Sequence, residues 1–175
     1  MTPHLANTPV LETERLILRA PSAQDFDGWA DFVASERSKY AGGPLDRALA
    51  WRAFGHIVGH WTLRGYGMFS VTPKGDDTAF GIVGAYFPEG RPERELGWTI
   101  WDDQHEGRGI AFEAAIAARR FVYDVLGWET AVSYIHPKNT RSIALAERLG
   151  ATEDPNADRP APEDLVYRHP DPEDL

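Results

Sequence analysis

Two glycines, Gly107 and Gly109, stand between a strand-like run and a helical run, and this transition limits how the chain can fold. Residues 95–101 (ELGWTIW) contain β-formers, whereas residues 111–126 repeat small and apolar side chains at helical spacing. The first N–H groups of a helix lack partners within it, and glycine lets a ligand approach the backbone closely. The turn therefore suits either an anion, with Arg108 adding positive charge, or a plain tight connection.

The residues around the turn restrict the kind of anion site. Asp102, Asp103 and Glu106 precede or enter it and would repel an anion, unless they point away or cap the helix. Phe112 stands where a dinucleotide-binding G-x-G-x-x-G motif needs its third glycine, and the chain contains no G-x-x-x-x-G-K-[ST] motif. These two common phosphate-binding fingerprints are therefore excluded.

The first half of the chain predicts one strand, two helices and an antiparallel meander. A strand is expected at 16–19, with Ser22 as N-cap of a helix over 23–36. A second helix ending near residue 64 has an apolar stripe formed by Trp51, Phe54, Val58 and Trp61. Turn signals then separate three predicted strands at 66–72, 80–87 and 95–101.

The second half predicts a strand–helix–strand crossover. The helix at 111–126 ends before Gly127, and a strand follows at 130–135. A short helix at 139–149 and a last edge strand at 165–169 complete an α+β order. The 175 residues are expected to form one domain, 1–175, with 170–175 as a frayed tail.

Composition points to a cytoplasmic protein without disulfides. The chain contains no cysteine, no apolar run of membrane-spanning length and no basic, apolar leader at its start. Of its net charge of −9, most lies in residues 153–175, with eight acidic and two basic residues. This balance disfavours nucleic acid and membrane surfaces as partners. It suits a cationic partner such as an amine, or serves only as a solvated surface.

The residues around the glycine turn resemble those of a known family. Residues 104–111 (QHEGRGIA) are similar to the Q/R-x-x-G-x-G/A signature of the GNAT family of N-acetyltransferases. The stretches TERLILR (13–19), ELGWTIW (95–101) and NTRSIALAERLG (139–150) resemble the branch that includes the RimJ and RimL ribosomal-protein N-terminal acetyltransferases. The resemblance extends from about residue 11 to 169, and the combination is more specific than any one stretch.

The resemblance implies a GNAT-like mixed, mostly antiparallel sheet of six to seven strands, with a V-shaped splay and about four helices. It also implies that acetyl-CoA binds as cosubstrate, with no metal. Its pantetheine arm would pair with the backbone of Trp98, Thr99 and Ile100. Its pyrophosphate would meet the signature residues, which are Gln104, Gly107, Arg108, Gly109, Ile110 and Ala111. Asn139 would contact the cofactor arm or act only as a helix N-cap, and Ser142 would lie near the thiol or at the surface.

The implied reaction is direct attack of a primary amine, either a protein N-terminus or a small molecule, on the thioester. Glu95 would be the catalytic or water-ordering carboxylate, or simply a strand-end carboxylate in solvent. Ser142 or Tyr134 would return a proton to the thiolate, since Ala146 stands where relatives often have a tyrosine. A non-catalytic acyl-CoA-binding domain is the alternative function. A homodimer is common in the family.

A metal site has little support in the sequence. His56 and His60 lie one helical turn apart, a spacing that can bind zinc. No third ligand is identifiable, and the glutamate of H-E-x-x-H is missing.

Overall fold

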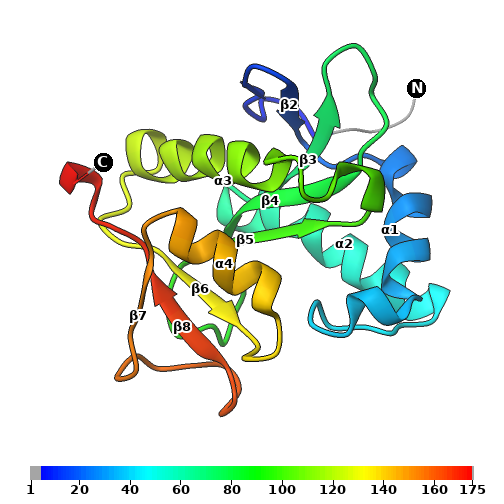
Figure 1. Cartoon of the computed structure of the whole chain (residues 1–175). Helices are drawn as coiled ribbons and strands as arrows, with labels where there is room; N and C mark the ends of the chain where they lie inside the picture. Colours follow the sequence, from blue (N-terminus) through cyan, green and yellow to red (C-terminus); the bar gives the residue numbers. More distant parts are fainter. Residues whose placement is uncertain (1–4, 175) are drawn as a thin grey trace.

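A computed structural model of the chain describes residues 5–174 and shows one sheet with helices on both faces (Figure 1). Eight strands lie in the order β1-β2-β3-β4-β5-β6-β8-β7. All neighbouring strands are antiparallel except the parallel pair β5 and β6. In chain order the strands are β1 (Leu11–Glu12), β2 (Leu16–Arg19), β3 (Met68–Pro73), β4 (Gly81–Tyr86), β5 (Glu95–Ile100), β6 (Val132–Ile135), β7 (Thr152–Glu153) and β8 (Leu165–Arg168).

The mixed, mostly antiparallel sheet is confirmed, but eight strands replace the six to seven predicted. The additional strands β1 and β7 have two residues each, which is too short for any alternating pattern. Strand β7 pairs with the outer edge of β8, so residues 165–168 do not form the edge strand that the sequence predicted.

Four α-helices are present within residues 5–174, as predicted. They are α1 (Phe26–Val33), α2 (Arg47–Arg64), α3 (Ile110–Arg120) and α4 (Thr140–Arg148). The helix predicted over 23–36 is wrong in extent, because 3-10 turns occupy Ala23–Asp25 and Glu36–Ser38. The helix predicted at 111–126 ends as a π-helix over Phe121–Val125. No helix in this part of the chain combines the length and apolarity needed to cross a bilayer.

The segment predicted as a frayed tail contains some local structure within the described residues. Pro172–Asp174 form a 3-10 helix, and the hydroxyl of Tyr123 donates a hydrogen bond of 2.9 Å to the carbonyl of Pro170. Leu175 lies outside the described residues.

The central strands are apolar on both faces because helices cover both faces (Figure 1). On β4, Ile82 joins the cluster formed with α1 and α2, whereas Val83 joins the cluster formed with α3. Burial of both faces removes the polar–apolar alternation of a half-exposed strand. Trp51 departs from the predicted stripe of α2, since it is 61% exposed and contacts the ring of Phe26 only edge-on.

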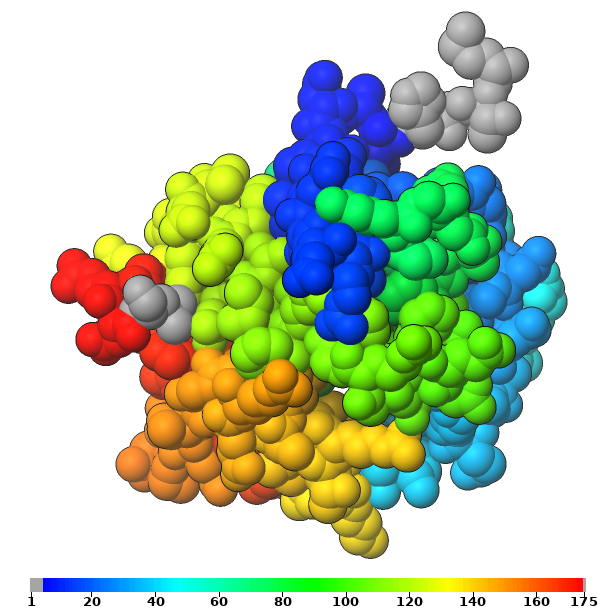
Figure 2. Space-filling model, turned by 45° about the horizontal axis from the view of Figure 1, so that its top comes forward, coloured from blue at the N-terminus to red at the C-terminus, as the bar shows by residue number. Residues whose placement is uncertain are grey.

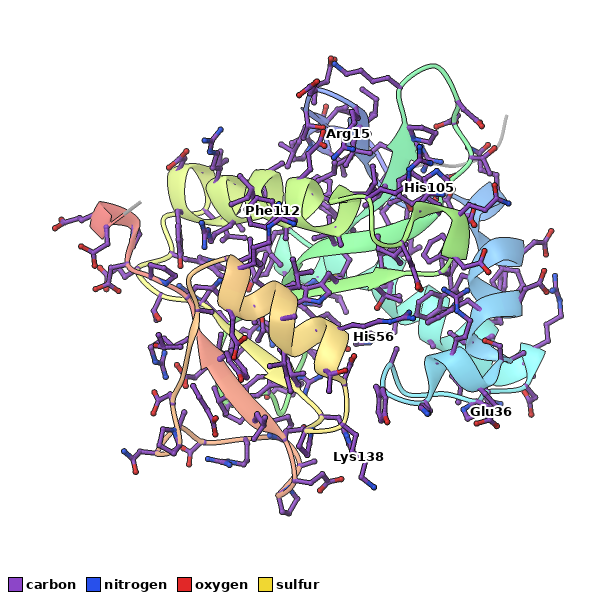
Figure 3. The ribbon with its side chains drawn as sticks, viewed as in Figure 1. Arg15, Glu36, His56, His105, Phe112 and Lys138 are labelled. Atoms are coloured by element: carbon purple, nitrogen blue, oxygen red, sulfur yellow. The ribbon has the colours of Figure 1, made fainter. Side chains whose placement is uncertain are left out.

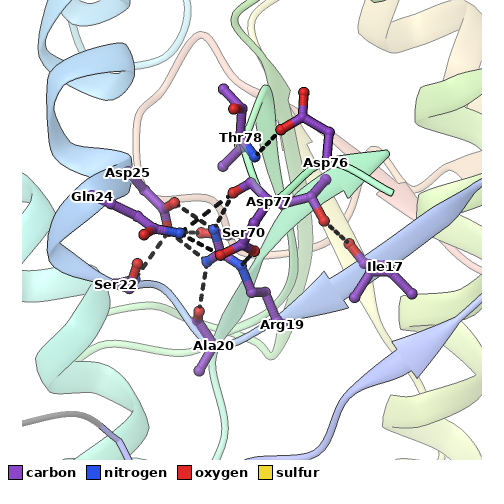
Figure 4. Close-up of polar contacts among 12 residues, drawn as sticks. Ile17, Arg19, Ala20, Ser22, Gln24, Asp25, Ser70, Asp76, Asp77 and Thr78 are labelled. Atoms are coloured by element: carbon purple, nitrogen blue, oxygen red, sulfur yellow. Dashed lines mark hydrogen bonds and ion pairs between the residues drawn. The ribbon is translucent and has the colours of Figure 1, made fainter. Parts of the chain in front are cut away.

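A shared guanidinium connects β2 to the first helical turn (Figure 4). Arg19 donates two hydrogen bonds to the buried carboxylate of Asp25, at 2.7 and 2.8 Å. It also pairs with Asp77, in the loop between β3 and β4, at 2.5 Å. The hydroxyl of Ser70 and the backbone N–H of Ser22 donate to the same Asp25 oxygen, Oδ2. The buried charge of Asp25 is therefore fully hydrogen-bonded.

A buried histidine packs where β5 and β6 meet. His169 is 2% exposed, and its Nε2 lies 3.0 Å from the hydroxyl of Ser133. That hydroxyl donates to the carbonyl of Leu96 at 2.6 Å, so His169 Nε2 is the donor to Ser133. Burial lowers the pKa of His169 from 6.5 to about 3, which keeps the ring neutral.

This histidine predicts an acid-sensitive fold. Between pH 6.5 and about 3 the unfolded chain binds a proton at residue 169 that the folded chain does not bind. The free energy of unfolding therefore falls as pH decreases through this window, by up to about 1.4 kcal/mol per pH unit from this group. Chemical denaturation at a series of pH values should show a shallower decrease for His169→Gln. Equal slopes for the two proteins would contradict the assignment.

Candidate active site

The strands β5 and β6 pair at one position and then separate. Glu95 is paired with Val132, and the N–H of Val132 donates to the carbonyl of Arg94 at 3.1 Å. One residue further along, the side chain of Ser133, rather than a backbone group, contacts the carbonyl of Leu96. The ladder does not continue beyond this point in the described chain. This geometry is the V-shaped splay that the family resemblance implied.

The separation leaves one edge of β5 without a neighbouring strand. Trp98, Thr99 and Ile100 pair with β4 on one side, and no strand within residues 5–174 pairs with them on the other side. All three are partly exposed. Unpaired backbone groups along a strand edge can bind an extended ligand by adding hydrogen bonds.

The indole of Trp98 connects this edge to α4. Its Nε1 donates a hydrogen bond of 3.3 Å to the hydroxyl of Ser142, in the first turn of α4. The Ser142 hydroxyl keeps its own proton for donation. Two predicted site residues, one from β5 and one from α4, are therefore in contact.

The glycine turn follows the end of β5 and leads directly into α3. Gly107 and Gly109 have φ angles of +69° and +74°, which non-glycine residues rarely adopt. A Cβ at Gly107 would meet no atom within 4 Å, and one at Gly109 would approach only Arg15, at 3.8 Å. The space above the turn is therefore open. Helix α3 begins at Ile110, and the first N–H groups of a helix lack acceptors within it, so they are available to a ligand at the turn.

Two of the three acidic residues of the turn, Asp102 and Glu106, are engaged in local contacts. Asp102 accepts a hydrogen bond of 2.9 Å from the N–H of Gln104, whose side chain is exposed. Glu106 is held between Arg37, at 2.6 Å, and Arg141 of α4. The condition set by the sequence is met in part: Asp102 caps a 3-10 turn and Glu106 pairs with arginines, whereas Asp103 is exposed. Arg108 is exposed.

Arg15 is a residue of this site that the sequence reasoning did not identify. It precedes β2, and the N-terminal segment lies across the surface beside α3 (Figures 2 and 3). Glu113, in the first turn of α3, accepts hydrogen bonds from Arg15 Nε at 2.6 Å and from its backbone N–H at 2.9 Å. Arg15 Nη1 also donates to the carbonyl of Arg108 at 3.1 Å. The stretch TERLILR contained the signal, but the partner lies 98 residues away.

Asn139 caps α4, as one of its two predicted roles required. Its side chain accepts a hydrogen bond of 3.4 Å from the N–H of Ser142. Ala146, on the same helix, is fully buried against Ile135 and Tyr167 and offers no hydroxyl to the splay.

Glu95 is a buried carboxylate at the closed end of the splay, not a strand-end carboxylate in solvent. The residue is 9% exposed, and its Oε2 accepts no hydrogen bond within residues 5–174. Desolvation raises the pKa of Glu95 to about 7, although the nearby Arg91 guanidinium acts in the opposite direction. A carboxyl group with this pKa exchanges protons readily near neutral pH, which suits a general base.

The histidines of α2 are bound to the protein itself. His60 Nε2 accepts from the N–H of Phe87 at 2.9 Å, so its Nδ1 donates to the carbonyl of Tyr66 at 2.8 Å. His56 Nε2 lies 3.0 Å from the hydroxyl of Tyr86. Among the described residues no group of three or more histidines and carboxylates is arranged to hold a metal ion.

A hollow of ≈ 570 Å³ lies outside the splay, on the α1 side of the turn. Its lining includes Asp31, Asp76, Asp102 and Asp103 together with Arg37. The excess of carboxylates makes it unsuitable for an anion. The open edge of β5, rather than this hollow, connects the predicted site residues.

Comparison with known proteins identifies the class to which this fold and site belong. The model of a protein family described as "Acetyltransferase (GNAT) domain" matches residues 15–152. The chain therefore belongs to the GNAT acetyltransferases.

Solved structures support this assignment over nearly the whole chain. An acetyltransferase from Agrobacterium tumefaciens is 41% identical, with a TM-score of 0.89 over 97% of this chain and 99% of that one. A GNAT-family protein from Bordetella pertussis is 26% identical, with a TM-score of 0.77 over 93% and 100% of the two chains. The ribosomal alpha-N-protein acetyltransferase RimL shares the fold at 14% identity, with a TM-score of 0.72 over 96% and 97%.

The contribution of the Asn139 cap to the stability of the fold can be tested without any ligand or activity assay. Asn139→Ala should lower the free energy of unfolding by about 0.5–1 kcal/mol, because the N–H of Ser142 loses its acceptor, and Asn139→Ser should restore most of it. Urea denaturation measures both. Asn156→Ala, in an exposed loop, is the matched control and should be neutral. Full stability of Asn139→Ala would show that the cap contributes nothing.

Proposed function

We propose that the protein is an N-acetyltransferase that moves an acetyl group from acetyl-CoA to a primary amine. One observation supports this most directly. A buried carboxylate, Glu95, and a glycine turn at a helix N-terminus lie at opposite ends of the same strand, β5, whose edge is open between them. The edge would bind an extended arm, the turn a pyrophosphate, and the carboxylate a proton.

Each part of the cofactor has suitable residues in the proposed site. The pyrophosphate would contact the N–H groups of residues 107–111, where the helix dipole favours negative charge, with Arg15 close to Gly109. The pantetheine amides would pair with the open edge at 98–100. Asn139 and Ser142, at the start of α4, would face the arm from the other side of the splay.

The proposed chemistry is direct transfer. The amine nitrogen forms a bond to the thioester carbonyl carbon, the carbon–sulfur bond breaks, and its electron pair stays on sulfur. The acceptor attacks as a neutral amine, after its ammonium form has released a proton to solvent, and Glu95 takes one N–H proton from the nitrogen as the new bond forms, directly or through a water molecule. The thiolate receives a proton from solvent, either directly or through the Ser142 hydroxyl, which takes up a proton from water as it gives its own, since that proton is not committed to Trp98.

Energetics make a dedicated tyrosine acid unnecessary in this proposal. Positioning two reactants supplies roughly 7–11 kcal/mol of the barrier reduction. A general acid or base supplies about 10²–10⁴-fold, or roughly 3–5 kcal/mol. The alanine at position 146 therefore lowers the expected rate but does not exclude turnover.

The acceptor is proposed to be a primary amine that arrives in its protonated, cationic form. Asp164, at the end of the acidic 153–164 loop, lies close enough to Glu95 to raise its pKa. Near Asp164, Tyr40 of the 38–45 loop stacks on His136, with ring centres 4.8 Å apart. Both a protein N-terminus, as in the name of RimL, and a small-molecule amine fit this description. A cytoplasmic location and a homodimer remain predictions.

Cofactor binding is tested at the glycine turn. Gly109→Trp fills the open space above α3 and should raise the Kd of acetyl-CoA at least about tenfold, or 1.4 kcal/mol. Gly127→Trp is a matched control, because Gly127 has a φ of +65° and equally open surroundings at the far end of the helical segment. Isothermal titration calorimetry measures both. Unchanged affinity in Gly109→Trp would refute the placement of the pyrophosphate.

Proton transfer is tested at Glu95. Glu95→Gln should lower kcat by about 10²–10⁴-fold, the usual contribution of a general base, and leave the Kd of acetyl-CoA unchanged. Glu89→Gln, a fully exposed glutamate of the same hairpin, should have wild-type kcat. Thiol release from acetyl-CoA with a panel of amines provides the assay. Binding of acetyl-CoA without acetylation of any amine would instead support the non-catalytic domain.

A further inference from the structure

Arg91 lies between two aromatic rings at the closed end of the splay. It belongs to the hairpin that joins β4 to β5, and its side chain is 26% exposed. Its guanidinium carbon is 5.5 Å from the ring centre of Tyr86 on β4 and 5.3 Å from that of Tyr134 on β6. Cation–π contacts with two strands fix the position of the positive charge.

The charge of Arg91 is close to Glu95 without hydrogen-bonding to it. Arg91 Nε is 3.3 Å from Glu95 Oε2, within ion-pair distance. The same Oε2 nevertheless accepts no hydrogen bond in the described chain, because the N–H direction does not meet hydrogen-bond geometry. The carboxylate thus gains a stabilising charge and keeps lone pairs available for a proton.

Other groups around Glu95 do not replace this charge. Asp164, from the loop before β8, opposes ionisation of Glu95. The Tyr134 hydroxyl accepts from the N–H of Glu93 at 3.1 Å, and the Tyr86 hydroxyl contacts His56 of α2 at 3.0 Å. The neighbouring His60 stacks on Tyr86, and burial lowers its pKa, so it contributes no fixed positive charge. His136, after β6, lies near Asp164 rather than Glu95.

We propose that Arg91 is a positioning residue that favours the ionised form of Glu95, the base for the acceptor amine, in its buried setting without engaging Oε2 in a hydrogen bond. The aromatic pair formed by Tyr86 and Tyr134 holds the guanidinium in place. This inference rests on the proposed function, in which Glu95 is the base.

The test measures the titration of Glu95 directly. In the ligand-free protein, carboxyl-carbon NMR of labelled glutamate, assigned with Glu95→Gln, should show the Glu95 titration at higher pH in Arg91→Gln, by about one unit. Arg91→Lys retains a positive charge, so its Glu95 titration should lie close to that of the wild-type protein. Arg94→Gln is the matched control, since Arg94 also lies over an aromatic ring, that of Trp128, but is not paired with Glu95. Thermal unfolding verifies that each variant is folded.

The pH dependence of acetyl transfer supplies a second readout. The acidic limb of kcat/KM should move to higher pH in Arg91→Gln by the same amount, with activity recovering at alkaline pH. A uniform loss of activity at every pH, or an unshifted Glu95 titration, would overturn the role of Arg91. A shifted titration in a protein that acetylates no amine would overturn the proposed function and the base role with it, while the charge effect would stand.

Discussion

The single pairing between Glu95 and Val132 is the interaction on which the rest of the site depends. Six of the seven strand pairings are antiparallel, whereas the one parallel pairing stops after its first residue pair. The Ser133 hydroxyl donates a hydrogen bond to the next acceptor along β5, the carbonyl of Leu96, and accepts one from the neutral ring of His169. A side-chain bond thus ends the ladder without leaving that carbonyl unpaired, and the strands beyond it can separate.

The two ends of β5 differ in their electrostatic environment. At one end a carboxylate is buried, and its pKa is raised to about 7. At the other end a helix begins beneath two glycines of positive φ, with arginines from the N-terminal segment and from α4 close by. Burial in a region of low dielectric brings the pKa of the carboxyl close to neutral at the first end. The N-terminal N–H groups of the helix favour an anion at the second end. One extended strand therefore joins two kinds of polar site.

The sequence predicted what depends on local pattern and left out what depends on distant partners. The glycine turn before α3, the cap at Asn139 and the existence of the four helices follow from residue type and periodicity. The two-residue strands and the π-helix have no such pattern. Side-chain pairs such as Arg15 with Glu113 form only once the sheet brings them together. Burial of Glu95 likewise follows from the topology.

The network around Arg19 connects four segments through one guanidinium and two carboxylates, those of Asp25 and Asp77. Arg19 belongs to β2, and the other members of the network come from the turn before α1, from β3 and from the loop before β4. Because Asp25 is buried, loss of Arg19 leaves this carboxylate without its ion-pair partner, and loss of Asp25 leaves Arg19 with Asp77 alone. The free-energy effects of substitutions at Arg19, Asp25 and Asp77 are therefore coupled and not additive. The attachment of the first helix to the sheet behaves as one cooperative unit rather than as a sum of separate bonds.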